Sequence, residues 1–258
     1  MIISKDDLAK LETQVTEILK SAGALLSKEW QNIKQVSFKA EGEPFTEMDV
    51  NIENIIRGEL AELLPEAGFI VEEGQNTEEK ELSWVIDPID QTKNFIGQIP
   101  LFYTQVALIQ NGSPILGAIY NPVSGQMFTA SSGNGAKLNG AQIAKPIKSK
   151  LLESIVDIDF GGSDGIDWKI KALEAIANRA HRIRISSAAL SPYLATVGID
   201  ALVVLSDKIK IVDVMPRIII GREMGLVFER ENIHGRQIYI AAEPSVFEEI
   251  KALLLLAF

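Results

Sequence analysis

Two aspartates three residues apart carry the clearest chemical signal in this chain. The apolar run 84–86 leads directly into Asp87, Asp90 follows, Pro88 stands between them, and Thr92 comes two residues later. The run predicts a short buried strand that Pro88 ends. Two carboxylates held close together repel each other, by about 4 kcal/mol at ~4 Å and an effective dielectric of ~20. A divalent cation reverses the sign of that interaction. Because the available donors are oxygens, we expect Mg²⁺.

Other acidic residues also fall at the ends of predicted elements. Glu72 and Glu73 follow the apolar run 69–71, and Asp213 precedes a predicted helix whose first turn would accommodate Pro216. Mg²⁺ ions held by shared carboxylates can activate a water and neutralise charge during phosphate ester hydrolysis. The joint pattern therefore favours a phosphate-hydrolysing metal site.

Each of these features also has an ordinary structural interpretation. Glu72 and Glu73 could be a solvated pair, and Asp213 could be a helix cap. The segment 87–90 could be a turn with Asx-type hydrogen bonds, and Thr46 with Asp49 could cap a helix. The order and spacing of all of them together is what favours chemistry.

The elements that must position these residues are both helical and extended. Apolar residues recur at helical spacing over 8–26, and a second helix is predicted from Asp49. Strand-like runs at 104–109, 115–120 and 126–131 are separated by turn signals, which predicts an antiparallel sheet. The last hundred residues alternate between strand and helix patterns, which indicates a second sheet. We expect an N-terminal half, 1–145, that carries most metal ligands and a C-terminal half, 146–258, that completes the site, in one compact unit.

Composition excludes several other classes of protein. The chain has 258 residues, a net charge of -10 and no cysteine, which argues against nucleic-acid and membrane partners and excludes a cysteine nucleophile. With only two histidines, a histidine-rich metal cluster is excluded as well. The charged N-terminus lacks a signal-peptide pattern, so we expect a cytoplasmic protein.

These motifs resemble those of the inositol monophosphatase family, within the lithium-sensitive, Mg²⁺-dependent sugar phosphatase superfamily. The family's Asp-Pro-(Ile/Leu)-Asp-Gly-Thr-x-Asn-Phe stands here at 87–95. Its Gly-Glu-Glu, Val-Thr-x-x-Asp and Trp-Asp-x-Ala-Ala segments resemble 71–73, 45–49 and 212–216. The resemblance implies an α+β fold, a five-layer α/β/α/β/α sandwich with an antiparallel N-terminal sheet and a second mixed sheet. It also implies a homodimer.

The resemblance further implies two or three Mg²⁺ ions with particular ligands. Glu72, Asp87 and the backbone carbonyl of Ile89 would hold the first ion. Asp87, Asp90 and Asp213 would hold the second, and Glu72 would help to hold a third. Asp90 would also lie near the leaving-group oxygen.

The same resemblance implies roles in handling water and phosphate. Thr92, hydrogen-bonded to Asp49, would orient the attacking water together with Glu72. The amides of Gln91 and Thr92 would bind the phosphate, and the C-terminal half would add the further substrate contacts Ser186, Ser187 and Lys210. Lys208, Lys210 and Arg217 either contact a second phosphate or form a solvated charged face, which is the more ordinary role.

Several positions depart from the family pattern. Gln91 replaces the motif glycine and is strained if that position needs a positive φ. Val212 replaces a tryptophan, Met215 and the proline after it replace two alanines, and Ser206 stands where some inositol phosphatases carry an acidic residue. The segment 208–213 resembles archaeal members, some of which also hydrolyse fructose 1,6-bisphosphate.

We therefore expect a Mg²⁺-dependent phosphomonoesterase acting on a small polyol or sugar phosphate, with inositol monophosphate and fructose 1,6-bisphosphate as the main candidates. A phosphatase for 3′-phosphoadenosine 5′-phosphate is the alternative enzyme. A non-catalytic phosphate-ligand-binding protein on the same scaffold is the alternative of another class.

Overall fold

The computed structural model describes residues 3–30, 36–38, 44–78, 80–143, 148–161, 165–185, 199–206 and 209–257. The chain forms two compact units, and each of them is built from two separate segments. The first unit comprises Met1–Gln142 and Ile211–Glu223, and the second comprises Ile143–Lys210 and Met224–Phe258. A helix from the last quarter of the sequence therefore belongs to the first unit.

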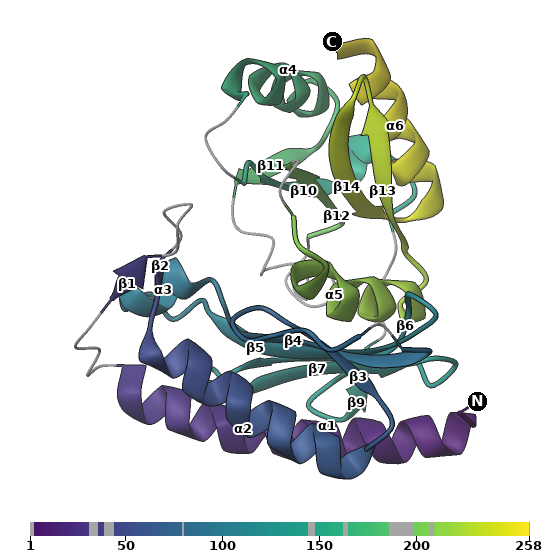
Figure 1. The fold of residues 1–258 in the computed structure, drawn as a ribbon. Coiled ribbons are helices and arrows are strands. Elements are labelled where there is room, and N and C mark those ends of the chain that lie inside the picture. The colour runs from purple at the N-terminus through teal and green to yellow at the C-terminus, as the bar shows by residue number, and fades with distance from the viewer. Residues whose placement is uncertain are drawn as a thin grey trace. The chain divides into compact units, whose positions relative to one another are not determined.

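A seven-stranded sheet forms the centre of the first unit (Figure 1). Its strands stand in sequence order: β3 (Gly68–Val71), β4 (Leu82–Asp90), β5 (Tyr103–Gln110), β6 (Ser113–Asn121), β7 (Gln126–Ser131), β8 (Ala136–Leu138) and β9 (Ala141–Gln142). All neighbours are antiparallel except β3 and β4, which are parallel. The antiparallel sheet expected from the turn signals is confirmed, with the edge strand β3 as the exception.

Helices cover both faces of this sheet (Figure 1). The helices α1 (Lys5–Glu29) and α2 (Glu47–Leu63) pack on one face, and α5 (Ile211–Glu223) packs on the other. Alternate residues of β4 divide between the two layers, since Trp84 and Ile86 join the core under α1 and α2, whereas Val85 packs with Val212 of α5. The remaining elements are the short helix α3 (Thr92–Ile96) and a two-stranded sheet of β1 (Ser37–Phe38) and β2 (Pro44–Phe45).

A glycine on β6 permits the close approach of α5 to the sheet. A Cβ atom added at Gly117 would lie 2.7 Å from the carbonyl oxygen of Pro216 and 2.5 Å from the side chain of Ile219. Any larger residue would push α5 away from the sheet, so Gly117 sets how near Asp213 can come to β4. The helix begins at Ile211, two residues before the predicted start, and Pro216 lies inside it.

The second unit contains a five-stranded mixed sheet in the order β11-β10-β12-β14-β13. Its elements are the 3-10 helix η2 (Leu151–Glu153), β10 (Ile155–Asp159), α4 (Ile166–Ala177), β11 (Arg182–Ile185), β12 (Ala201–Leu205), β13 (Val227–Ile233), β14 (Arg236–Ala242) and α6 (Pro244–Ala257). The strands β10, β11 and β12 are parallel, and β14 runs antiparallel to β12 and β13. The helices α4 and α6 share one apolar core with this sheet. The predicted α+β class with a second, mixed sheet is confirmed.

The structure contains no helix, within the residues that it describes, with the length and apolarity needed to cross a membrane. Within the alternating last hundred residues, the helix-like run 187–197 lies outside the described residues.

Candidate active site

A β-bulge brings the two motif aspartates to the same face of the sheet. Residues three apart on a regular strand point to opposite faces. Asp87 pairs with Gln105 and Asp90 pairs with Tyr103, so that two residues of β4, Pro88 and Ile89, stand opposite one residue of β5. The extra residue reverses the alternation, and Ile89 accordingly packs in the core under α1 and α2. Asp87 and Asp90 therefore both belong to the face that α5 covers.

Two further carboxylates converge on Asp87. Glu72 directly follows β3, whose last residue pairs in parallel with Ile86, so Glu72 leaves the sheet beside Asp87. Asp213 comes from the first turn of α5. Burial raises the pKa of Asp87 well above its ordinary value, and the negative charges of Glu72, Asp90 and Asp213 raise it further. The sequence thus predicted a set of carboxylates that act on one another in the folded chain.

Gln105 fixes the orientation of Asp87. Its Nε2 donates to Oδ2 of Asp87 at 2.9 Å and lies 3.4 Å from the carbonyl oxygen of Val212. That carbonyl has lost its usual helical donor, since Pro216, four residues later, has no N–H. Gln105 thereby ties β5 to both Asp87 and α5. Sequence analysis missed this residue, because its role depends on the pairing of β4 with β5.

Arg217 lies inside the carboxylate group and forms a buried ion pair with Asp90. The side chain of Arg217 is 3% exposed and that of Asp90 is 8% exposed. Burial lowers the pKa of Arg217, but Asp90, Asp213 and Asp87 together raise it above its ordinary value, so the side chain stays charged. The solvated charged face that we considered for Arg217 is therefore wrong. The available signal was its position within the apolar run of α5.

Thr92 and Asp49 form the pair that the resemblance implied. The Thr92 hydroxyl lies 3.4 Å from Oδ1 of Asp49 and 2.9 Å from the carbonyl oxygen of Ile89. Asp49 also accepts from the backbone N–H and the hydroxyl of Thr46, both at 2.7 Å, in a capping box at the start of α2. Burial raises the pKa of Asp49 to about 6, while the bonds from Thr46 oppose that rise. Asp49 is thus both a helix cap and a neighbour of the motif threonine.

Gln91 occupies a left-handed backbone conformation, with φ of 68° and ψ of 50°. The strain considered for glutamine at this glycine position of the motif is therefore present. Its carbonyl accepts the N–H groups of Asn94 and Phe95, so that the chain turns into α3 directly after Asp90. The left-handed residue is what allows strand and helix to meet here.

Glu53 on α2 positions the segment that carries Glu72. Its two carboxylate oxygens accept the backbone N–H groups of Glu73 and Gly74 at 2.8 Å and 2.7 Å. A Cβ at residue 74 would lie 2.6 Å from Oε1 of Glu53, so a larger residue there would displace this carboxylate. Sequence analysis did not single out Glu53, although its buried position on an otherwise apolar stripe of α2 was a usable signal.

Three predicted substrate contacts stay predictions. Ser186 and Ser187 lie outside the described residues, and Lys210 is exposed in the second unit. The residues that the structure brings together within the first unit are Asp49, Glu72, Asp87, Ile89, Asp90, Gln91, Thr92 and Asp213.

The donor set of this site fits a hard divalent cation. All of its ligating atoms are oxygens, and Oδ1 of Asp87 is buried with no hydrogen-bond partner among the described residues. A buried carboxylate oxygen without a donor, surrounded by like charges, is stabilised by a cation. Among the residues that the structure describes, however, no three acidic or histidine side chains gather closely enough to hold an ion.

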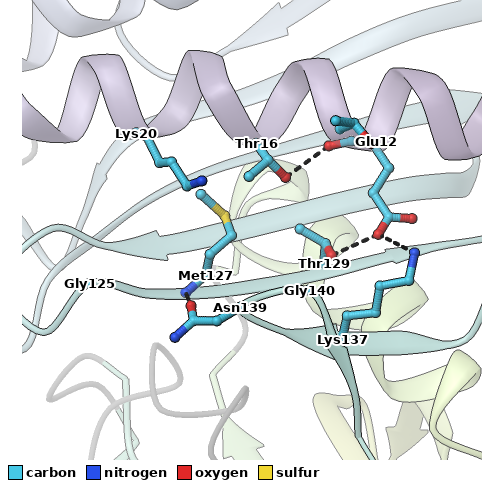
Figure 2. A pocket seen from close by; sticks show the side chains of 10 residues that line it. Glu12, Thr16, Lys20, Gly125, Met127, Thr129, Lys137, Asn139 and Gly140 are labelled. Atoms are coloured by element: carbon cyan, nitrogen blue, oxygen red, sulfur yellow. Dashed lines mark hydrogen bonds and ion pairs between the residues drawn. The ribbon is translucent and has the colours of Figure 1, made fainter.

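A second polar cluster lies under α1, on the face of the sheet opposite to α5 (Figures 1 and 2). Buried Glu12 accepts from Thr129 at 2.8 Å and from Ser131 at 2.7 Å, and it forms a 2.8 Å ion pair with Lys137. A cavity of about 460 Å³ adjoins it, lined by Glu12, Thr13, Thr16, Lys20, Gly125, Met127, Thr129, Lys137, Asn139 and Gly140. These contacts occupy both carboxylate oxygens of Glu12, and they join α1 to β7 and β8.

Comparison with known proteins identifies the class to which this fold and site belong. The model of the inositol monophosphatase family matches residues 7–252. The fructose-1,6-bisphosphatase/inositol-1-monophosphatase of Thermotoga maritima is 31% identical over 214 residues, which are 81% of this chain and 80% of that protein. A solved structure of an IMPase from the same organism superposes with a TM-score of 0.82 at 27% identity, covering 95% of this chain and 96% of the other. A solved IMPase/NADP phosphatase complexed with Mg²⁺ and phosphate has a TM-score of 0.80 at 19% identity, with 95% of each chain covered.

Together the fold and the carboxylate site define a phosphatase, a hydrolase of phosphate monoesters. This chain belongs to the inositol monophosphatase family.

Proposed function

We propose that this chain is a Mg²⁺-dependent phosphomonoesterase for a small phosphorylated polyol or sugar, with inositol monophosphate and fructose 1,6-bisphosphate as its main substrates. One observation carries the proposal. The buried carboxylate Asp87 has an oxygen that receives no donor from the described part of the chain, and it lies beside Glu72, Asp90 and Asp213. The Thermotoga maritima relative is named for activity on both substrates, which supports this choice.

The residues that would hold Mg²⁺ are Glu72, Asp87, Asp90, Asp213 and the carbonyl of Ile89. Bound Mg²⁺ would supply an acidified water and positive charge for the phosphoryl oxygens. The Ile89 carbonyl already accepts the Thr92 hydroxyl, but a carbonyl oxygen has two lone pairs, so it can serve both partners. Two or three ions, as the resemblance implies, stay a prediction.

Thr92, hydrogen-bonded to Asp49, would orient the attacking water together with Glu72, and Asp49 would accept the proton of the water through Thr92. The Thr92 hydroxyl has a single hydrogen, so its contacts with Asp49 and Ile89 are alternatives. When it donates to Asp49, its lone pairs are left to accept a hydrogen from water. The raised pKa of Asp49 makes this carboxylate a better proton acceptor than an ordinary aspartate.

The phosphate group would bind at the start of α3. The amides of Gln91 and Thr92 open this helix next to Asp90 and would offer donors to phosphate oxygens. The left-handed conformation of Gln91 turns the chain at this point. Further contacts to the rest of the substrate would come from Ser186, Ser187 and Lys210. We also predict that the protein is a homodimer and that it is cytoplasmic.

Phosphate release from a panel of substrates tests this proposal. We expect release from inositol 1-phosphate or fructose 1,6-bisphosphate that requires Mg²⁺ and stops in EDTA. Preferential hydrolysis of 3′-phosphoadenosine 5′-phosphate would establish the alternative enzyme. Mg²⁺ binding without release from any of these esters, in a folded protein, would favour the non-catalytic binding protein.

A further inference from the structure

Arg217 is a buried cation within the group of carboxylates that forms the proposed metal site. Its guanidinium contacts Asp90, and the charges of Asp213 and Asp87 also act on it. Asp213 precedes Arg217 by four residues on α5, which places both side chains on one face of the helix. The positive charge is therefore a fixed part of the site.

This cation engages one of the proposed metal ligands. The Asp90 oxygen that faces Arg217 is held in an ion pair whose two side chains are almost entirely buried. An ion that binds this oxygen of Asp90 must compete with a guanidinium that is already in place, and separating a buried pair without replacement is costly.

We propose that Arg217 is a resident counter-cation that holds Asp90 in place of a divalent ion, so that the site takes one ion fewer than its carboxylates alone would take. The inference rests on the proposed function, because it concerns the same Mg²⁺ site. It assigns to Arg217 a role that neither the stability of α5 nor the capture of a second phosphate provides. The positive charge of Arg217 is present at any concentration of metal ions.

The structure explains why this residue can stay in the site. Gly117 admits α5 to the sheet so closely that a side chain at 217 is buried there. Nε of Arg217 has no hydrogen-bond partner within the described part of the chain, so packing and charge rather than a full set of hydrogen bonds hold the group. Removing the charge while keeping an apolar side chain therefore isolates its electrostatic role.

Counting bound ions in charge-neutral and charge-conserving variants tests the proposal. The number of Mn²⁺ ions per chain and their affinities would be measured by equilibrium dialysis for the unmodified protein, R217M and R217K. R222M is the matched control, since Arg222 is an exposed residue on the same helix. We expect R217M to bind one more ion per chain, or to bind its weakest ion at least tenfold more tightly. R217K and R222M should keep the ion count of the unmodified protein.

Thermal unfolding gives a readout that does not depend on turnover. Mn²⁺ should raise the melting temperature of R217M more than that of the unmodified protein, because the ion would replace the missing positive charge at Asp90. Equal ion counts and affinities within twofold in the unmodified protein and R217M would overturn the proposal. Failure of R217M to fold at any Mn²⁺ concentration would also overturn it, since no ion could then replace the guanidinium.

Phosphate release by the unmodified protein separates this inference from the proposed function. Mg²⁺-dependent release with unchanged ion counts in R217M would overturn the role of Arg217 alone. If the unmodified protein neither released phosphate nor bound ions, the metal site itself would be overturned. An extra ion in R217M, with no release by the unmodified protein, would support the resident cation and reject the proposed activity.

Discussion

Asp49 offers a quantitative test of the electrostatics of the ion-free site. Its pKa is raised from 3.8 to about 6, chiefly by burial. The folded chain therefore favours the protonated carboxyl, and the stability that this provides is fully present below pH 3.8. It is lost as the pH rises through about 6. At about 1.4 kcal/mol per pKa unit, the loss approaches about 3 kcal/mol above that range.

The variant D49N isolates this contribution, because asparagine does not ionise. In EDTA, we expect the free energy of unfolding of the unmodified protein, measured with urea, to fall by about 2.5 kcal/mol relative to that of D49N between pH 4 and pH 7.5. Other titrating groups are common to both proteins and cancel in the difference. Tryptophan fluorescence would follow the transition, since Trp84 is fully buried in the same unit.

Saturating Mg²⁺ provides the control for this experiment. A bound cation favours ionised carboxylates, so the pH dependence of the difference should become smaller. The burial argument would be refuted if the difference in free energy of unfolding between the unmodified protein and D49N stayed constant within about 0.5 kcal/mol over this pH range in EDTA.

Three further predictions follow from individual contacts. Q91G should raise the free energy of unfolding by about 0.5–1 kcal/mol, because a left-handed residue costs about 1–2 kcal/mol and the entropy of glycine offsets part of that. An equal or lower value in urea would contradict this. T92V should reduce phosphate release at least about 100-fold, whereas T13V, on an exposed threonine, should not; equal rates would reject the role of the hydroxyl. E12Q should cost about 1–3 kcal/mol of stability by weakening the contact with Lys137. A changed rate per folded molecule would instead link that cluster to catalysis.

Local patterns predicted the elements better than they predicted the geometry of the site. The strand before Asp87, the turn between the strand-like runs 104–109 and 115–120, and the helix near Asp49 could all be recognised from residue types and spacing. The bulge at Pro88 and Ile89 could not, because it is defined by the register against β5. Without that bulge, Asp87 and Asp90 would point to opposite faces.

Buried charged residues were the main gap in the sequence analysis. Arg217 was considered for a phosphate contact or a solvated face, since arginine is mostly exposed in proteins. Glu12 and Glu53 lie on the buried stripes of α1 and α2, where a helical pattern predicts apolar residues. Their partners come from distant segments, so only the folded chain explains them.

Phosphate release by the unmodified protein and by D87N, with Mg²⁺ and with EDTA, tests the central claim most directly. Asp87 is the carboxylate on which the other acidic residues converge, so D87N should lose at least about 100-fold in rate. The same substitution removes a carboxyl group whose ionisation is opposed by burial and by neighbouring negative charges, and D87N should therefore melt at a higher temperature than the unmodified protein in EDTA. Release that persists in EDTA, or in a folded D87N protein, would contradict the account.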